Sequence, residues 1–127
     1  EAFNKIMDAF GLPKKTDEEK AMRKQAIQDA TKNAIMIPFR VMEVAYEAME
    51  VVKAMAETGN PNSVSDAGVG ALALRSCVKG AFLNVKINSG DLEDKDFVQH
   101  VMSKGKDIEQ KTEELERRVL EIVESKL

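Results

Sequence analysis

The 127-residue chain holds one cysteine, one histidine, one tyrosine and no tryptophan. A single cysteine excludes an internal disulfide bond. One cysteine and one histidine are also too few ligands for a zinc site built from these side chains. We therefore expect no metal site, and an unpaired cysteine favours a reducing, cytoplasmic location.

Long apolar runs are missing as well. No stretch approaches the roughly 18 residues that span a bilayer, and no signal peptide begins the chain, so we expect no membrane partner. The formal net charge of −3 argues against nucleic acid as the main partner, because duplex binding relies on a basic surface. These features together predict a soluble protein of the cytoplasm.

The composition favours helices. Hydrophobic residues make up 43% of the chain and charged residues 32%, but aromatic residues only 5%, and strands prefer the aromatic and β-branched types. A chain of this length forms at most one domain, so residues 1–127 are treated as a single helical domain. The opening "EAFNKIMDAFG" already shows the apolar spacing of an α-helix and has no initiating methionine. We therefore expect the chain to begin inside a helix and to lack an N-terminal part.

Terminating and capping residues divide the first half of the chain. The first predicted helix ends at Gly11. Thr16 and Glu19 match the capping box that begins a second helix, which continues to about Glu57. Pro38 interrupts the helical pattern without accompanying turn residues, so we predict one long helix with a kink there.

The second half of the chain adds two more helices. A third is predicted from about Ser65 to Asn88, and a fourth from near Asp94 to the end. The sequence thus predicts an all-α fold, a mainly antiparallel bundle of long helices, one of them kinked near Pro38. His100 falls on a polar face of the last helix, where we expect a surface residue.

The third predicted helix has two distinctive faces. One face carries small residues that lead to two amides, namely Ala73, Cys77, Gly80, Asn84 and Asn88. Such a stripe either admits another helix very closely or leaves room for a planar ligand whose polar edge the amides bind. A second face carries the basic residues Arg75, Lys79 and Lys86, which form either a solvated surface or a trap for carboxylates and phosphates.

A dense polar loop precedes this helix. The stretch "GNPNSVSDAGVG", residues 59–70, contains five polar residues, Asn60, Asn62, Ser63, Ser65 and Asp66. All five are good turn formers or helix caps, and one cap needs only one of them. A polar loop at a helix N-terminus also presents free N–H groups to an anionic or carbonyl-bearing ligand. Composition and spacing alone leave the function open.

The same stretch also carries a family resemblance. "GNPNSVSDAGVGAL" followed by "KGAFLNVKIN" closely resembles the cyclodeaminase/cyclohydrolase family, which includes the cyclodeaminase half of formiminotransferase-cyclodeaminase and bacterial methenyltetrahydrofolate cyclohydrolases. "EAFNKIMDAFGLPKKTDEEK" and "IPFRVMEVA" extend the resemblance to essentially the whole chain. Family members normally begin with a glycine-rich segment and a further helix, neither of which is present here.

The resemblance implies a fold, a substrate and partners. It implies an all-helical, commonly dimeric protein that acts on one-carbon tetrahydrofolates without a metal or redox cofactor, and a formiminotransferase as a further partner. Cyclodeaminases convert 5-formiminotetrahydrofolate to 5,10-methenyltetrahydrofolate and ammonia. The alternative within the family is a cyclohydrolase, which converts 5,10-methenyltetrahydrofolate to 10-formyltetrahydrofolate. The alternative outside enzymes is a non-catalytic helical module that dimerises through the small-residue face.

Candidate roles follow from this chemistry. Asp66 is the candidate for proton transfer or for holding the donor edge of the pterin, although a carboxylate in the first turn of a helix also simply suits the helix dipole. The candidate substrate-binding residues fall into three groups. They are Asn62, Ser63 and Ser65 for the pterin or the reacting carbon, Asn84 and Asn88 for the ring, and Arg75, Lys79 and Lys86 for the carboxylates of the glutamate tail.

Overall fold

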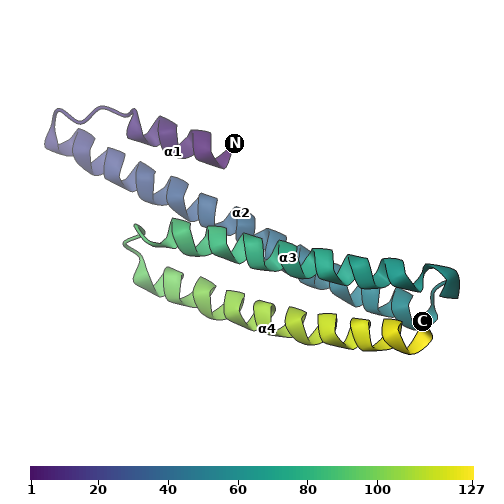
Figure 1. Ribbon diagram of the computed structural model, residues 1–127. Coiled ribbons are helices and arrows are strands. Elements are labelled where there is room, and N and C mark those ends of the chain that lie inside the picture. Colours follow the sequence, from purple (N-terminus) through teal and green to yellow (C-terminus); the bar gives the residue numbers. More distant parts are fainter.

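The computed structural model describes residues 1–127, and every regular element in it is helical (Figure 1). None of its helices combines the length and the apolar character that crossing a membrane requires. The predicted all-α fold is therefore confirmed. The elements in chain order are α1 (Ala2–Phe10), α2 (Asp17–Thr58), the short 3-10 helix η1 (Pro61–Ser63), α3 (Val64–Ser89) and α4 (Lys95–Lys126).

Local side-chain chemistry sets where the helices begin. The Thr16 hydroxyl accepts a hydrogen bond from the Glu19 N–H at 3.1 Å, and the Glu19 carboxylate accepts one from the Thr16 N–H at 3.2 Å. The predicted capping box is therefore present at the start of α2. At the start of α4, Asp94 Oδ1 accepts from the Phe97 N–H at 3.1 Å. Gly11 follows the last residue of α1, as predicted.

Pro38 does not divide α2. The helix is continuous from Asp17 to Thr58 with the proline inside it, which confirms the prediction of one long helix. Because proline lacks an N–H, the Ala34 carbonyl one turn earlier receives no helical hydrogen bond from this position.

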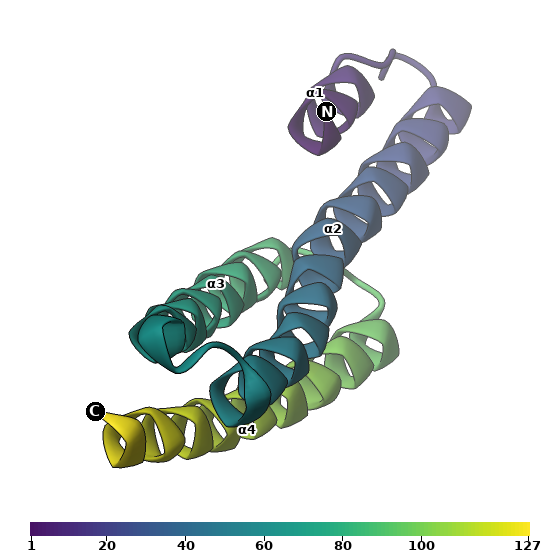
Figure 2. The same ribbon diagram turned by 90° about the vertical axis from the view of Figure 1, so that its right-hand side faces the viewer.

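Helices α2, α3 and α4 form the bundle, and α1 packs against α2 outside it. The short connections make α3 antiparallel to both α2 and α4, while α1 and α4 lie on opposite sides of the α2–α3 pair (Figures 1 and 2). Lys126 Nζ joins the ends of α4 and α2 by donating to the Ala56 carbonyl at 2.6 Å and the Glu57 carbonyl at 2.7 Å. At the other end of α4, Asp94 pairs with Lys32 of α2 at 2.7 Å.

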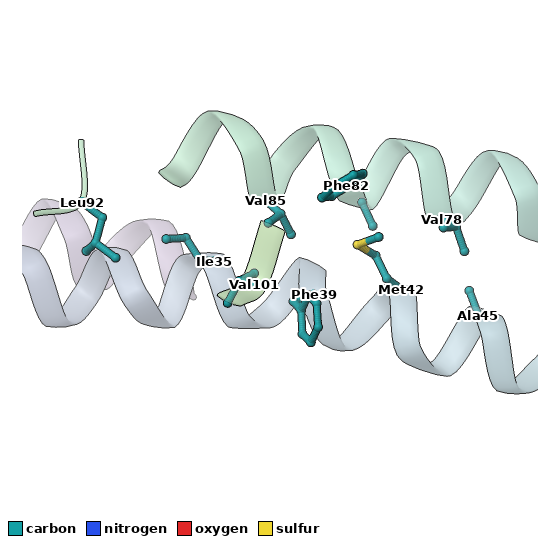
Figure 3. Close-up of a cluster of buried hydrophobic side chains, with 10 residues drawn as sticks. Ile35, Phe39, Met42, Ala45, Val78, Phe82, Val85, Leu92 and Val101 are labelled. Atoms are coloured by element: carbon teal, nitrogen blue, oxygen red, sulfur yellow. The ribbon is translucent and has the colours of Figure 1, made fainter. Parts of the chain in front are cut away.

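The core lies between α2, α3 and α4. Figure 3 shows its larger cluster, in which Phe82 and Met42 meet at the centre. Gly105 of α4 lies directly against this cluster, since a Cβ atom at position 105 would come within 2.4 Å of Cε2 of Phe82. The glycine thus lets α4 approach the Phe82 ring closely. The remaining core positions are occupied mainly by alanine, valine and methionine, in two clusters along the bundle.

Candidate functional site

Three pockets follow one another along the face of α2 and α3 that α4 leaves uncovered. No residue of α4 lines any of them. The first two pockets share Val41 and Cys77, so they are continuous along the groove between the two helices. We call this surface the α2–α3 face. It contains the hollows in which several of the predicted site residues lie.

The largest of these hollows, the amide pocket, has a volume of about 520 Å³. Asn84 and Asn88 of α3 supply its amides, and the start of α1 closes one side. Eight of its eleven lining residues are hydrophobic, and the full lining is Ala2, Phe3, Ile6, Ala34, Ile37, Pro38, Val41, Cys77, Ala81, Asn84 and Asn88. An apolar hollow with a few polar groups is typical of a small-molecule site.

Both amides of this pocket are held by main-chain carbonyls. Asn88 Nδ2 donates to the Ala34 carbonyl of α2 at 3.0 Å, and Asn84 Nδ2 donates to the Gly80 carbonyl of its own helix at 3.0 Å. Neither Oδ1 accepts a hydrogen bond within the chain, and each amide has a second N–H. The two side chains therefore remain able to bind the polar edge of a ligand.

The polar loop forms a second hollow at the opposite end of the α2–α3 face. This carboxylate pocket, about 330 Å³ in volume, is lined by Asp66 and Ser63 together with Asn60 and apolar residues of α2. Asp66 lies in the first turn of α3, exposed and without a hydrogen bond in the chain. Asn60 Oδ1 accepts from the Asn62 N–H at 3.0 Å and so stabilises the turn. Asn62 and Ser65 are exposed and do not line this pocket.

Arg75 corrects the sequence analysis. The expectation of a solvated or ligand-binding basic face is wrong for this residue, which is only 8% exposed. Its guanidinium pairs with Glu113 at 2.7 Å and with Glu116 at 3.1 Å, and it donates to the Glu109 carbonyl at 3.4 Å. All three partners belong to α4. The sequence could not show which side of α3 the last helix covers, so Arg75 looked like a free cation.

The other two basic candidates stay on the surface. Lys79 and Lys86 are exposed, and the Lys86 ammonium lies 4.0 Å from the centre of the Phe82 ring, which favours a cation–π contact. Neither lysine lines the amide pocket or the carboxylate pocket. The basic trap for a glutamate tail is therefore not assembled within one chain. His100 is exposed on α4, as predicted, and lines none of the three pockets.

A single chain does not bring Asp66 together with the two amides. Asp66 and Asn84 are 18 residues apart on α3, and Asp66 and Asn88 are 22 apart, which corresponds to about 27 and 33 Å along the helix. They line different pockets. The sequence analysis assigns all three side chains to one folate, but the isolated chain does not hold them in one cavity, because they lie near opposite ends of a straight helix.

The structure also identifies lining residues that the sequence analysis did not single out. Phe3 and Ile6 of α1 and Ile37 of α2 form the apolar wall of the amide pocket. The signal was present in the apolar spacing of the first helix, but nothing in that spacing shows that α1 folds back along α2 and brings its first residues to this pocket. No group of three or more His, Cys, Asp or Glu side chains is arranged to hold a metal ion.

Comparison with known proteins identifies relatives of this chain. A family model described as Formiminotransferase-cyclodeaminase matches residues 1–124. The methenyltetrahydrofolate cyclohydrolase of Methylorubrum extorquens is 39% identical over 127 residues, which are all of this chain and 61% of that protein. The formimidoyltransferase-cyclodeaminase of Gallus gallus is 38% identical over 96 residues, 76% of this chain and 18% of that protein.

A solved structure agrees with these relatives. The crystal structure of formiminotetrahydrofolate cyclodeaminase from Thermotoga maritima superimposes with a TM-score of 0.82 and 27% identity, over 98% of this chain and 58% of that chain. The chain thus spans about three-fifths of the length of the bacterial cyclohydrolase and of the Thermotoga protein.

Proposed function

The chain belongs to the formiminotransferase-cyclodeaminase family, and from this membership we propose that it acts on a one-carbon tetrahydrofolate as a formiminotetrahydrofolate cyclodeaminase. The observation that carries the proposal is the amide pocket. Its volume of about 520 Å³ suits a compact ring system, and its apolar walls suit the faces of a pterin. Asn84 and Asn88 offer oxygens and N–H groups to the polar edge of that ring.

The reaction requires two proton transfers. N10 of the folate attacks the formimino carbon and forms a bond to it, and the bond from that carbon to the departing nitrogen breaks to release ammonia. One group accepts the proton from N10, and one group protonates the leaving nitrogen. Asp66 is our candidate for one of these transfers, because it is a carboxylate that lines a pocket and has no partner in the chain. Ser63 lines the same pocket and is the candidate for contacting the substrate there.

The remaining predicted contacts lie outside the linings of both pockets. Asn62 and Ser65 lie beside the carboxylate pocket in sequence but outside its lining, and Lys79 and Lys86 are the exposed candidates for the glutamate tail. We further propose that the protein works as a homodimer in the cytoplasm, without a metal or redox cofactor, alongside a formiminotransferase.

The second candidate is methenyltetrahydrofolate cyclohydrolase. The observation that favours it is the 39% identity, over the whole chain, to a protein that carries this name. Both reactions use the same ring system and pass through a tetrahedral carbon bound to both N5 and N10, so the pocket geometry is compatible with either. The distinction depends on whether water or the folate N10 attacks the one-carbon unit.

A spectroscopic assay separates the two activities. Formation of 5,10-methenyltetrahydrofolate from 5-formiminotetrahydrofolate supports the cyclodeaminase, and loss of supplied 5,10-methenyltetrahydrofolate supports the cyclohydrolase. Calorimetric titration with tetrahydrofolate tests the pocket itself. We expect Asn84→Ala to weaken binding about fivefold, since one hydrogen bond contributes about 1 kcal/mol and about 1.4 kcal/mol corresponds to a factor of ten. Ser76→Ala, on an exposed position of the same helix outside the pocket, is the matched control. Equal affinities for the two variants would contradict the proposed site.

A further inference from the structure

A second hollow adjoins the amide pocket. It is lined by residues of α1, α2 and the end of α3, has a volume of about 300 Å³, and shares Ile6 and Asn88 with the amide pocket. We call it the end hollow. Its polar lining residues are Gln28, Thr31, Asn88 and Asp91. No lysine or arginine lines either space, so neither offers a charge that would attract the anionic tail of a folate.

The orientation of both asparagine amides is fixed by their partners. The Ala34 and Gly80 carbonyls only accept hydrogen bonds, so each asparagine turns its nitrogen toward the carbonyl. Exchanging nitrogen and oxygen in either amide would place two acceptors against each other. The oxygens of Asn84 and Asn88 therefore lie on the side of each amide that is away from the carbonyl. The second N–H of each amide stays on the nitrogen that is held there.

The other donors of the end hollow are also engaged. Thr31 Oγ1 donates to the Ile27 carbonyl at 2.7 Å, and Gln28 Nε2 donates to the Asp91 carbonyl at 3.4 Å. Gln28 Oε1 accepts from the Glu93 N–H at 2.8 Å, so both ends of this side chain bind the main chain. The Thr31 oxygen and the exposed Asp91 carboxylate remain, and both can accept. The polar groups that are free for a ligand are thus mainly acceptors.

A set of acceptors selects a ligand by its donors. The pyrimidine ring of a pterin has two donors side by side, the 2-amino group and N3–H, whereas its 4-oxo group is an acceptor. Two acceptors that face each other both lose a hydrogen bond, and leaving a polar group unpaired in a pocket costs more than one bond contributes. The edge with the two donors is therefore the one that fits the amides.

We propose that the oxygens of Asn84 and Asn88 accept hydrogen bonds from the 2-amino and N3–H groups of the pterin and select the substrate by this edge. N5 lies on the opposite side of the ring system from the 2-amino group, so the one-carbon unit is directed away from the two amides. Asp66 is then left with proton transfer and not with the donor edge. The inference rests on the proposed function for the class of ligand, and it adds which atoms bind the ring.

A matched pair of ligands tests the edge. Tetrahydrofolate and its 2-deamino-2-oxo counterpart carry the same tail and differ at position 2, where an oxygen replaces the amino group. We expect calorimetric titration to give an affinity about tenfold or more higher for tetrahydrofolate. Equal affinities would overturn the inference and leave the proposed function standing. Binding of neither ligand would overturn both, whereas the expected preference without turnover would support the inference and count against the proposed reaction alone.

Two variants separate the oxygen of Asn84 from its nitrogen. Asn84→Asp keeps acceptors and loses both N–H groups, whereas Asn84→Leu has a similar size and neither. The ratio of the affinities for the two ligands is measured, because the charge of the variant acts on the shared tail of both. We expect Asn84→Asp to keep or raise this ratio, and Asn84→Leu to lower it about fivefold. An equal fall in both variants would show that the nitrogen makes the contact and would overturn the inference.

Ser76→Ala is the control, at an exposed position of α3 that lines neither space, and it should keep the ratio of the parent chain. Circular dichroism verifies that the variants fold, which we expect because Asn84 is exposed and its hydrogen bond lies within its own helix. A ratio that fell equally in Ser76→Ala and Asn84→Leu would show that selection does not depend on a contact from Asn84, and this would also overturn the inference.

Discussion

Asn88 of α3 donates a hydrogen bond from Nδ2 to the carbonyl of Ala34 on α2, 3.0 Å away. Pro38, one turn after Ala34, has no N–H with which to satisfy that carbonyl, so the amide of a neighbouring helix replaces the missing helical bond. All three residues line the amide pocket. The missing N–H of Pro38 on α2 and the amide of Asn88 on α3 thus together fix the contact between these two helices at the amide pocket.

Asn88→Ala should therefore destabilise the protein. The variant leaves the carbonyl of Ala34, a buried residue, without a partner, which costs about 1–3 kcal/mol. Urea unfolding followed by circular dichroism measures the change. Asn84→Ala is the matched control, because Asn84 is exposed and bonds only within its own helix. Similar losses in both variants would contradict a special role for the Asn88–Ala34 bond.

Two glycines should respond in opposite directions to alanine. Gly105→Ala places a methyl group against the fully buried Phe82 ring, and overpacking of this kind costs about 1–3 kcal/mol, more than the roughly 1 kcal/mol that alanine gains in a helix. Gly80→Ala meets no atom of its own chain and should stabilise the isolated chain by about 1 kcal/mol. Thermal unfolding at low protein concentration measures both. A gain for Gly105→Ala would show that α4 shifts easily.

Asp94 should make the stability depend on acid pH. The hydrogen bond from the Lys32 ammonium, and then the one from the Phe97 N–H, lower the pKa of the Asp94 carboxyl below its ordinary value of 3.8. A lowered folded-state pKa stabilises the protein above the unfolded-state pKa, and this contribution is lost as the pH falls through the folded-state pKa. Asp94→Asn keeps an oxygen for capping but removes the charge. The urea midpoints of the two proteins should differ at neutral pH and converge as the pH falls through the lowered pKa of Asp94. Asp91→Asn, at an exposed position without an ion pair, is the control.

Arg75→Met should lower stability without changing folate affinity. It leaves Glu116, which is 20% exposed at its side chain, without its partner, and breaking a partly buried pair costs about 1–3 kcal/mol. The folded fraction should bind tetrahydrofolate as the parent chain does, because the guanidinium is directed toward α4. Calorimetric titration of the folded variant makes the distinction. Weakened binding would place Arg75 in the site. Lys104→Met, at an exposed position of α4 without an ion pair, shows the effect of losing a positive charge alone.

The sequence predicts correctly the starts and ends of helices that depend only on residues within or next to the same helix. The capping box at Thr16 and Glu19, the cap at Asp94 and the end of α1 at Gly11 depend on residues within a few positions of each other. The sequence does not predict the surroundings of a side chain where these depend on how a second helix packs. Whether Arg75 meets water or the carboxylates of α4 depends on how α4 is rotated about its axis, which no pattern within α3 encodes.

The candidate site follows the same rule. Asn84 and Asn88 do share a pocket, because their four-residue spacing places them on one face of a helix. Their predicted union with Asp66 fails in one chain, because residues 18 and 22 positions apart on a straight helix cannot meet. The residue types were sound indicators of a pocket, whereas the distance between the two groups along the helix was visible in the sequence and excludes a single cavity within one chain.

Asp66→Asn tests the role of this carboxylate in the reaction. The variant should lower turnover by about tenfold or more with unchanged helicity, because the residue is exposed and without a bond in the chain. Ser76→Ala, at an exposed position of the same helix that lines neither pocket, is the matched control and should keep the turnover of the parent chain. Turnover is followed by the formation of 5,10-methenyltetrahydrofolate, and helicity by circular dichroism. A turnover of Asp66→Asn equal to that of the control would remove the carboxylate from the chemistry and leave it as a residue that only favours the start of α3.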